Sequence, residues 1–177
     1  METKAIPNGT ITTPKGFLAG AVSVSLKTKG GLDLGILYSE VPCVAAGVFT
    51  SNRIKAAPLV LCQGHLSDRR AQAIVVNSGC ANACTGEGGV GDAAEMANLV
   101  AKKLGIQPED VLVASTGVIG LRLPMEKVRP GIKEISLSQD GGHELARAIM
   151  TTDTHSKEVA VVAEKGGVTI GGVAKGA

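Results

Sequence analysis

Aromatic residues are scarce in this sequence of 177 residues. They make up 2% of the chain, as one Tyr and two Phe, and Trp is absent. Proteins that bind single-stranded nucleic acid stack the bases on aromatic rings, so the scarcity disfavours that class of function. The hydrophobic core must therefore be built from Val, Ile, Leu and Ala side chains.

The sequence also lacks blocks of like charge and long apolar runs. Eighteen basic and 16 acidic side chains give a formal net charge of +2, which predicts no attraction to nucleic acid or to an anionic membrane. No apolar run approaches the roughly 20 residues of a membrane span. The N-terminal segment has no basic start followed by an apolar stretch, as a secretory signal would. We therefore expect a cytoplasmic protein with no nucleic-acid or membrane partner.

Cysteine is present, but without the spacing of a metal site. Of Cys43, Cys62, Cys80 and Cys84, only the last two are close, as C-x-x-x-C. Zinc sites usually show tighter and duplicated spacing, often with His nearby. We predict reduced, mostly buried thiols, as is usual in a cytosolic chain, with neither a metal nor a cofactor.

Short apolar runs predict strands, mostly in the first half of the chain. Lys29-Gly30-Gly31 separates the first two runs and predicts a hairpin turn. The short polar connections favour antiparallel or mixed pairing. Near the C-terminus, Val168 to Ile170 predict a strand that bends or bulges at Gly171-Gly172, before a second short apolar run. The other predicted strands cover residues 21–26, 32–39, 45–51, 59–62, 71–77, 110–116 and 158–164.

Three segments predict helices. The clearest is 92–105, where Asp92 as N-cap and Glu95 three residues later form a capping box. A second begins at Pro124 and is broken or bent at Pro130, and a third covers 144–150. The order of elements predicts an α/β or α+β fold. One mixed sheet or two sheets would carry helices outside, within a single domain spanning residues 1–177.

Four segments hold more Gly and small polar residues than packing requires, and each has a functional and a structural interpretation. Residues 77–92 run from a strand into the helix at 92, where glycines and helix amides could bind an anion. The alternative is a structural loop. In residues 115–120, the Thr116 hydroxyl and the Gly117 amide could donate to one oxyanion. The alternative is a turn with a capping hydroxyl.

The other two segments are equally ambiguous when taken alone. Residues 150–157 contain Thr151, Thr152, Asp153 and His155, a possible hydroxyl–acid–base set. Adjacent side chains rarely point into one site, however, so a capping cluster is the competing interpretation. In the closing "GGVAKGA", a lone Lys175 on a strand edge is normally a solvated residue that discourages edge pairing. Chemistry alone favours the structural interpretation.

Taken together and in this order, the segments resemble the ornithine acetyltransferases, the glutamate N-acetyltransferases of arginine biosynthesis. The resemblance runs from about Lys15 to the last residue. One departure is Cys80, where the family usually has Asn, and we expect this exchange to alter packing near the site. The matching segments are "GVFTSN" (47–52), "NSGCANACTGEGG" (77–89), "ASTGVIG" (114–120), "AIMTTDT" (148–154) and "GGVAKGA" (171–177).

The resemblance implies a layered α/β/β/α sandwich completed by a second chain. Members are made as precursors that cut themselves at an Ala-Thr bond, and the new N-terminal Thr of the β chain is the nucleophile. This chain would then be the α chain, with the cut several residues beyond Ala177. The family assembles as α2β2 or higher. The acetyl group moves from N-acetylornithine to glutamate, with acetyl-CoA as a further candidate donor.

The resemblance also implies roles for individual residues. Thr116 and Gly117 match the oxyanion-hole pair. Thr151 or its neighbour Thr152, and Lys175, match contacts to the substrate. Two alternatives remain open. One is an aminopeptidase-like amidohydrolase of the same fold, whose second chain would begin with Ser. The other is a non-catalytic anion-binding module that uses residues 77–92 and needs no second chain.

Overall fold

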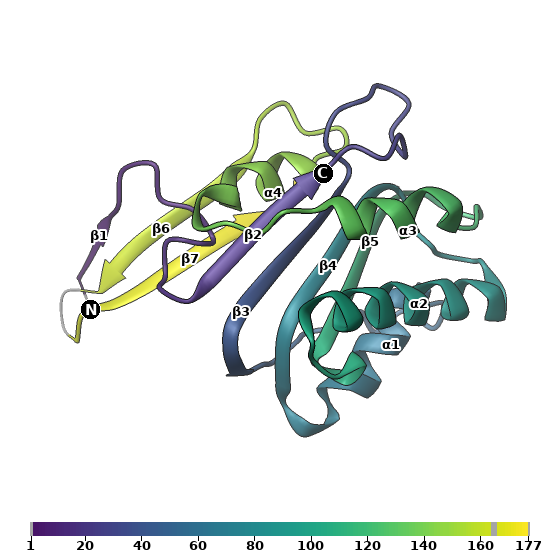
Figure 1. Cartoon of the computed structure of the whole chain (residues 1–177), viewed down its shortest axis with the longest axis horizontal. Coiled ribbons are helices and arrows are strands. Elements are labelled where there is room, and N and C mark those ends of the chain that lie inside the picture. The colour runs from purple at the N-terminus through teal and green to yellow at the C-terminus, as the bar shows by residue number, and fades with distance from the viewer. Residues whose placement is uncertain (1, 164–165, 177) are drawn as a thin grey trace.

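A computed structural model describes residues 2–163 and 166–176, which form two β-sheets with helices packed on them (Figure 1). The elements in chain order are β1 (Thr3–Ala5), β2 (Phe17–Val22), β3 (Leu34–Val44), α1 (Ala57–His65), η1 (Leu66–Asp68), β4 (Arg70–Cys80), α2 (Gly86–Leu104), η2 (Pro108–Asp110), β5 (Val111–Val118), α3 (Met125–Glu134), η3 (Gln139–Gly141), α4 (Gly142–Ala148), β6 (Lys157–Ala163) and β7 (Val168–Ala174).

The larger sheet has the order β2-β3-β4-β5 and mixed direction. β2, β3 and β4 pair antiparallel, whereas β4 and β5 are parallel and are joined by the crossover helix α2. The predicted antiparallel pairing of the first two strands is confirmed, and Gly30 and Gly31 adopt a positive φ in their connection. That connection spans residues 23–33, however, so the predicted tight hairpin turn at 29–31 is wrong. The pairing pattern places the carboxyl ends of β2, β4 and β5 at one edge of the sheet.

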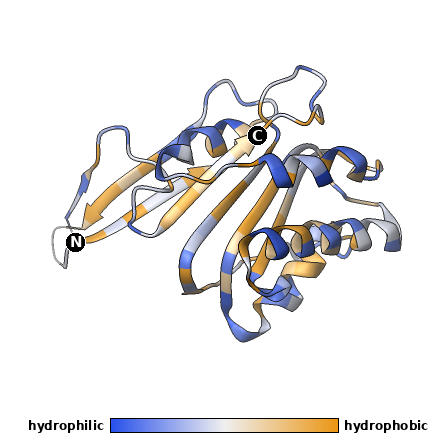
Figure 2. Cartoon of the chain, in the orientation of Figure 1, coloured by the Kyte–Doolittle hydropathy of each residue, from blue (hydrophilic) through white to orange (hydrophobic). Residues whose placement is uncertain are grey.

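The hydrophobic core lies between one face of this sheet and the helices α1, α2 and α3. Leu34, Ile36 and Val75 from the sheet are fully buried, as are Met96 of α2 and Val128 of α3. Figure 2 shows apolar residues concentrated in the strands, whereas the helices carry polar residues along much of their length. The pattern agrees with helices that bury one stripe against a sheet and present the other side to solvent.

Helix α4 packs on the opposite face of the larger sheet. A Cβ atom at Gly35 would lie 2.7 Å from Leu145 of α4. Successive residues of a strand point to opposite faces, and the neighbours Leu34 and Ile36 face the core described above. α4 also contacts β6 of the smaller sheet, whose order is β1-β6-β7 and whose pairs are antiparallel. The expected layered mixed α/β class, with two sheets and outer helices, is confirmed.

Two strand predictions in the first half are wrong, and a third is misplaced, since β2 covers Phe17–Val22 instead of 21–26. Residues 59–62 lie in helix α1, where Pro58 occupies the first turn and sets a helical φ. A short apolar run does not distinguish a strand from a buried helical segment. Residues 45–51 belong to an irregular connection between β3 and α1. Its apolar side chains stay exposed, including Val48, so no pattern of burial fixes a strand there.

The predicted helix boundaries need correction as well. α2 begins at Gly86 instead of Asp92, because Asn82 donates to the Gly89 carbonyl at 2.8 Å and supports the glycine-rich first turn. Asp92 is not an N-cap. Its carboxylate is buried and accepts two hydrogen bonds from Arg122, at 2.5 and 2.6 Å. The third helix covers 142–148 instead of 144–150.

Two predicted breaks do not occur. α3 continues through Pro130 to Glu134, since Val128 and Ile132 on either side are buried and hold both halves against the sheet. β7 likewise runs through Gly171 and Gly172 without a bend. A Cβ atom at Gly171 would lie 2.6 Å from the Thr10 carbonyl oxygen, so glycine here permits a close backbone approach within a continuous strand.

Candidate functional site

The Thr116–Gly117 pair lies at the carboxyl end of β5, beside an irregularity in the sheet. Gly117 pairs with Gly79 of β4, while Cys80 pairs with both Thr116 and Val118. Because Ala73 pairs with Val111 and Cys80 with Val118 at the same offset, neither strand carries an extra residue, and the second pairing of Cys80 with Thr116 makes the ladder irregular at this end. Thr116 is half-buried and Gly117 is exposed, so solvent reaches both. The arrangement leaves the Thr hydroxyl and the Gly amide at an open sheet edge.

Gly117 and Gly79 are both required as glycines by the space around them. Their φ angles are +135° and +106°. A Cβ atom on Gly117 would collide with the Gly79 backbone, including its carbonyl oxygen at 2.5 Å. A Cβ atom on Gly79 would in turn lie 2.5 Å from the Leu26 carbonyl oxygen. Three backbone segments thus pack without side chains between them, and this contact fixes the orientation of the Gly117 amide.

Buried Asp33 holds the segment around Leu26 in place. Its carboxylate accepts backbone N–H groups of Val24 and Leu26, at 2.7 and 2.6 Å, and of Lys27 at 3.2 Å. The connection from β2 to β3 is therefore fastened beneath Gly79. Sequence reasoning missed Asp33, although a lone acidic residue at the start of an apolar strand is a signal for such a buried acceptor.

Cys80, the departure from the family pattern, packs directly beside the Thr116–Gly117 turn. Its side chain is 7% exposed, and its thiol donates to the Leu121 carbonyl at 3.2 Å. The expected effect on packing near the site therefore concerns the loop after β5. All four cysteines are free thiols, as predicted, but only Cys62 and Cys80 are buried, whereas Cys84 is exposed. Burial raises the pKa of the Cys62 thiol.

The 150–157 segment meets the C-terminal segment at Asp153. The Asp153 carboxylate accepts the Thr151 backbone N–H at 3.1 Å, the Lys157 ammonium at 2.6 Å and the Gly176 backbone N–H at 2.7 Å. The first of these is the local capping contact that the sequence favoured. The hydrogen bond from Lys157 and those from the backbone amides hold the pKa of the Asp153 carboxyl far below its usual range.

The predicted site residues are thus gathered at one edge of the larger sheet. Ser78, the partner of Thr116 in the β-ladder, donates from its hydroxyl to the Ala148 carbonyl at the end of α4. Thr151 follows shortly after that helix, and Lys175 precedes Gly176. Thr152 and Lys175 are exposed, and Thr151 is half-buried.

Lysine side chains surround the junction. Lys27 lies near Asp153, and its ammonium donates to the Arg147 carbonyl at 3.5 Å. Burial lowers the pKa of Lys27, while Asp33 and Asp153 oppose that shift. Lys157 and Lys175 add two further positive charges, against two carboxylates. The junction therefore carries a small excess of positive charge.

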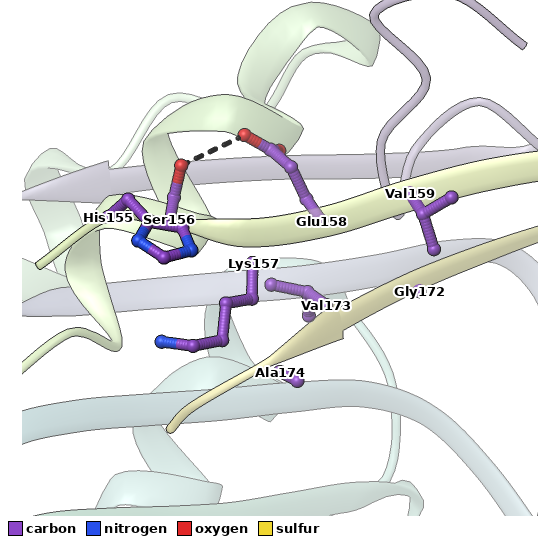
Figure 3. A pocket seen from close by; sticks show the side chains of 8 residues that line it. All are labelled: His155, Ser156, Lys157, Glu158, Val159, Gly172, Val173 and Ala174. Atoms are coloured by element: carbon purple, nitrogen blue, oxygen red, sulfur yellow. Dashed lines mark hydrogen bonds between the residues drawn. The ribbon is translucent and has the colours of Figure 1, made fainter. Parts of the chain in front are cut away.

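An open hollow of about 550 Å³ adjoins this junction on the smaller sheet. Figure 3 shows the residues that line it on the paired strands β6 and β7, with Lys157 extending toward the segment that follows β7. Within residues 2–163 and 166–176, no group of His, Cys, Asp and Glu side chains could hold a metal ion. In the same described part, no helix has the length and apolar character needed to cross a membrane. The hollow is lined by His155, Ser156, Lys157, Glu158, Val159, Gly172, Val173 and Ala174.

The fold and these segments define a mixed α/β domain with two sheets and a Thr-Gly pair at the carboxyl end of the edge strand β5. Known proteins are similar to this chain over nearly its whole length. A protein of Dehalococcoides mccartyi described as arginine biosynthesis bifunctional protein ArgJ is 56% identical over 176 residues, covering 97% of this chain and 44% of its own length. Its counterpart in Symbiobacterium thermophilum is 53% identical and is covered over 43% of its length.

Two solved structures match nearly the whole chain. The crystal structure of arginine biosynthesis bifunctional protein ArgJ from Bacillus halodurans has a TM-score of 0.93 at 39% identity, over 99% of this chain and 94% of that chain. Ornithine acetyltransferase from Mycobacterium tuberculosis, complexed with ornithine, has a TM-score of 0.92 at 42% identity, over 99% and 96%.

The sequence pattern of the ArgJ family matches residues 18–177. The chain belongs to the ArgJ family. It spans less than half the length of the curated relatives that it matches, 44% and 43% for the two named above.

Proposed function

We propose that this chain is one part of a self-processing acetyltransferase of arginine biosynthesis, which transfers the acetyl group of N-acetylornithine to glutamate. The observation that carries the proposal is the match to the ornithine-bound ornithine acetyltransferase, at 42% identity over 99% of this chain. Acetyl-CoA is a second candidate donor, used as a substrate and not as a bound cofactor. A cytoplasmic enzyme of composition α2β2 or higher is part of the proposal.

A comparison of lengths supports a second chain as the partner. The curated relatives are more than twice as long as the part that this chain covers. The chains in the two solved structures, by contrast, are covered over 94% and 96%. Solved chains of nearly this length, beside relatives of twice the length, are what cleavage near the middle of a precursor produces. The remaining half would supply the nucleophile.

Exposed apolar side chains give independent support for that partner. Val159, Val168 and Ile170 on β6 and β7 are each more than half exposed, as are Val48 and Ile54 in the connection before α1. Monomeric proteins rarely leave contiguous apolar surface of this kind uncovered. We infer that the second chain covers the smaller sheet, with an interface as apolar as a domain core.

The proposed reaction is a double displacement on an N-terminal Thr of the second chain. Its hydroxyl oxygen bonds to the acetyl carbon, the amide C–N bond breaks, and the hydroxyl proton passes through the α-amine of that Thr to the departing ornithine. The glutamate amine then attacks the acetyl ester, which releases the Thr hydroxyl. In both steps the carbonyl oxygen becomes an oxyanion, and the Thr116 hydroxyl and the Gly117 N–H donate to it.

We assign substrate binding to the junction where the segment after α4 meets the segment after β7. Thr151 or Thr152 would contact the substrate from the segment after α4. Lys175 would meet a carboxylate from the segment after β7, as a mobile point charge with three donors. The positive excess around Asp153 supports an amino-acid substrate.

Steady-state kinetics test the double displacement. With the protein expressed from its complete reading frame, initial rates at several fixed glutamate concentrations should give parallel double-reciprocal lines against N-acetylornithine. The covalent intermediate separates the two substrates, which is why the lines do not cross. Intersecting lines, with no acetylated second chain by mass spectrometry, would contradict the mechanism. Hydrolysis of peptide substrates without acetyl transfer would favour the aminopeptidase-like alternative.

The isolated chain should not function by itself. Residues 1–177 expressed alone are expected to aggregate and to show no transferase activity, because the apolar face of β6 and β7 lacks its cover and the nucleophile is absent. Size-exclusion chromatography and thermal unfolding provide the measurement. A soluble monomer with one sharp transition would contradict this expectation and would favour the anion-binding module instead.

A further inference from the structure

We propose that Asp153 is a positioning residue that fastens the two substrate-contacting segments, one bearing Thr151 and the other Lys175, into a single carboxylate-binding site. The inference rests on the proposed function. It adds a residue whose side chain contacts no reacting atom but sets where the contacting residues lie. The observations that carry it are the three hydrogen bonds of one buried carboxylate, two of them local and one from Gly176, which lies 23 residues away in the sequence.

The two carboxylate oxygens of Asp153 accept hydrogen bonds from different segments. Oδ2 accepts the Thr151 backbone N–H and so closes the turn after α4. Oδ1 accepts both the Lys157 ammonium at the start of β6 and the Gly176 backbone N–H beyond β7. The Asp153 side chain is only 1% exposed, so its carboxylate is satisfied by these three donors and not by bulk solvent. A single carboxylate thereby connects the exit of α4, the start of β6 and the segment after β7.

Lys157 keeps the Asp153 carboxylate ionised, and it leaves Lys175 as the positive charge for the substrate. Its ammonium lies 2.6 Å from Asp153 Oδ1 and is 37% exposed. The pair is formed four residues apart, at the point where β6 begins. In its ionised form Asp153 only accepts hydrogen bonds, and all three neighbours are donors. The charges of Asp153 and Lys157 balance, so the anion specificity of the site depends on other lysines.

Lys175 remains available for a substrate carboxylate. Its ammonium is exposed and donates to the Gly176 carbonyl at 2.8 Å. Among the ion pairs within the described ranges, none involves Lys175. The Gly176 amide, one residue along, is the group that Asp153 holds. The carboxylate therefore fixes the backbone beside Lys175 while it leaves the ammonium unneutralised.

Loss of Asp153 should consequently affect substrate binding more than chemistry. Without the acceptor, the backbone at Gly176 is released from the turn at Thr151, and Lys175 no longer has a defined position. The Thr116–Gly117 turn is fastened separately, through Gly79 and Asp33, and should keep its geometry. This separation predicts a rise in KM for the acetyl donor with a much smaller fall in kcat.

The test uses the protein from the complete reading frame and the variants Asp153→Ala and Asp153→Asn. Asp153→Ala should raise KM for N-acetylornithine roughly 10-fold or more, the range expected when hydrogen bonds to a charged group are lost. Asp153→Asn should have an intermediate effect, because its amide oxygen still accepts from one side. The matched control is Asp140→Asn, at an exposed carboxylate of η3, for which KM should not change.

Hydrogen exchange gives a readout that does not require activity. The Gly176 and Thr151 amides should exchange much faster in Asp153→Ala than in the wild-type protein, because both acceptor oxygens are lost, while amides of β4 and β5 stay protected. Protected Gly176 and Thr151 amides in a folded variant would overturn the proposal. So would an unchanged KM combined with a lower melting temperature, which indicates a purely structural role. A wild-type protein without transferase activity would instead contradict the proposed function, and the exchange result would still decide the role of Asp153.

Discussion

Replacing Thr116 by Ala is expected to lower the turnover of acetyl transfer roughly 10²-fold, because the loss of one oxyanion donor usually costs about 3 kcal/mol of transition-state stabilisation. Thr116 is half-buried at the end of β5, so its methyl and hydroxyl groups make limited packing contacts. Stability should therefore change little. The measurement is kcat of the purified variant, with thermal unfolding recorded in parallel.

Two controls separate the hydroxyl from the rest of the side chain. Thr116→Ser keeps the donor and should retain most of the turnover, whereas Thr116→Val keeps the shape and should behave like the Ala variant. Intact mass must show whether each variant is processed, since uncleaved protein would be inactive for another reason. A fully processed Thr116→Ala enzyme with wild-type turnover would rule out the oxyanion role.

Replacing Gly117 by Ala should have the larger combined effect. The Cβ atom would collide with the Gly79 backbone, and φ at this position is +135°. A positive φ costs a non-glycine residue of order 1–3 kcal/mol, and overpacking adds typically 1–3 kcal/mol. We expect a destabilisation of about 2–6 kcal/mol from these two costs together. The ladder between β4 and β5 would have to open, which moves the Gly117 N–H away from the oxyanion.

Gly120→Ala is the matched control for this prediction. Gly120 also has a positive φ, of +83°, but a Cβ atom there meets nothing within 4 Å. The Gly120→Ala variant should therefore lose only the free energy of the strained backbone, about 1–2 kcal/mol. The geometry of Thr116 and Gly117 should be retained. Denaturant unfolding and turnover of both variants provide the comparison. Equal stability losses for Gly117→Ala and Gly120→Ala would show that the contact with Gly79 has no energetic role.

The fold class could be predicted because local signals agreed with the tertiary structure in most segments. The antiparallel pairing of the first two strands and the long apolar runs of β4 and β5 are examples. Predictions failed where distant contacts decide the structure. The glycine-rich start of α2 has weak helix propensity and depends on Asn82. The run at 59–62 is helical because Pro58 precedes it and because α1 contacts β5. The capping pattern at Asp92 does not reveal its ion pair with Arg122, and the glycine pair at 171–172 does not reveal the close approach of Thr10.

The candidate site shows the same division. The Thr116–Gly117 pair and the substrate contacts were predicted as short motifs, and their roles remain predictions. Sequence alone favoured a capping cluster within residues 150–157, which the hydrogen bond from the Thr151 N–H to Asp153 matches. Its bond from Gly176 joins residues 23 positions apart and depends on the pairing of β6 with β7. Local patterns carry no information about that pairing, so the connecting role became apparent only in the folded chain.

The most direct test of the central claim is the intact mass of the protein from its complete reading frame, before and after brief incubation with N-acetylornithine. We predict two chains, the second beginning with Thr, and one acetyl group that appears on the second chain and disappears when glutamate is added. The chain described here should keep its mass throughout. A single uncut polypeptide that transfers acetyl groups, or acetylation of this chain in place of the second, would contradict the account.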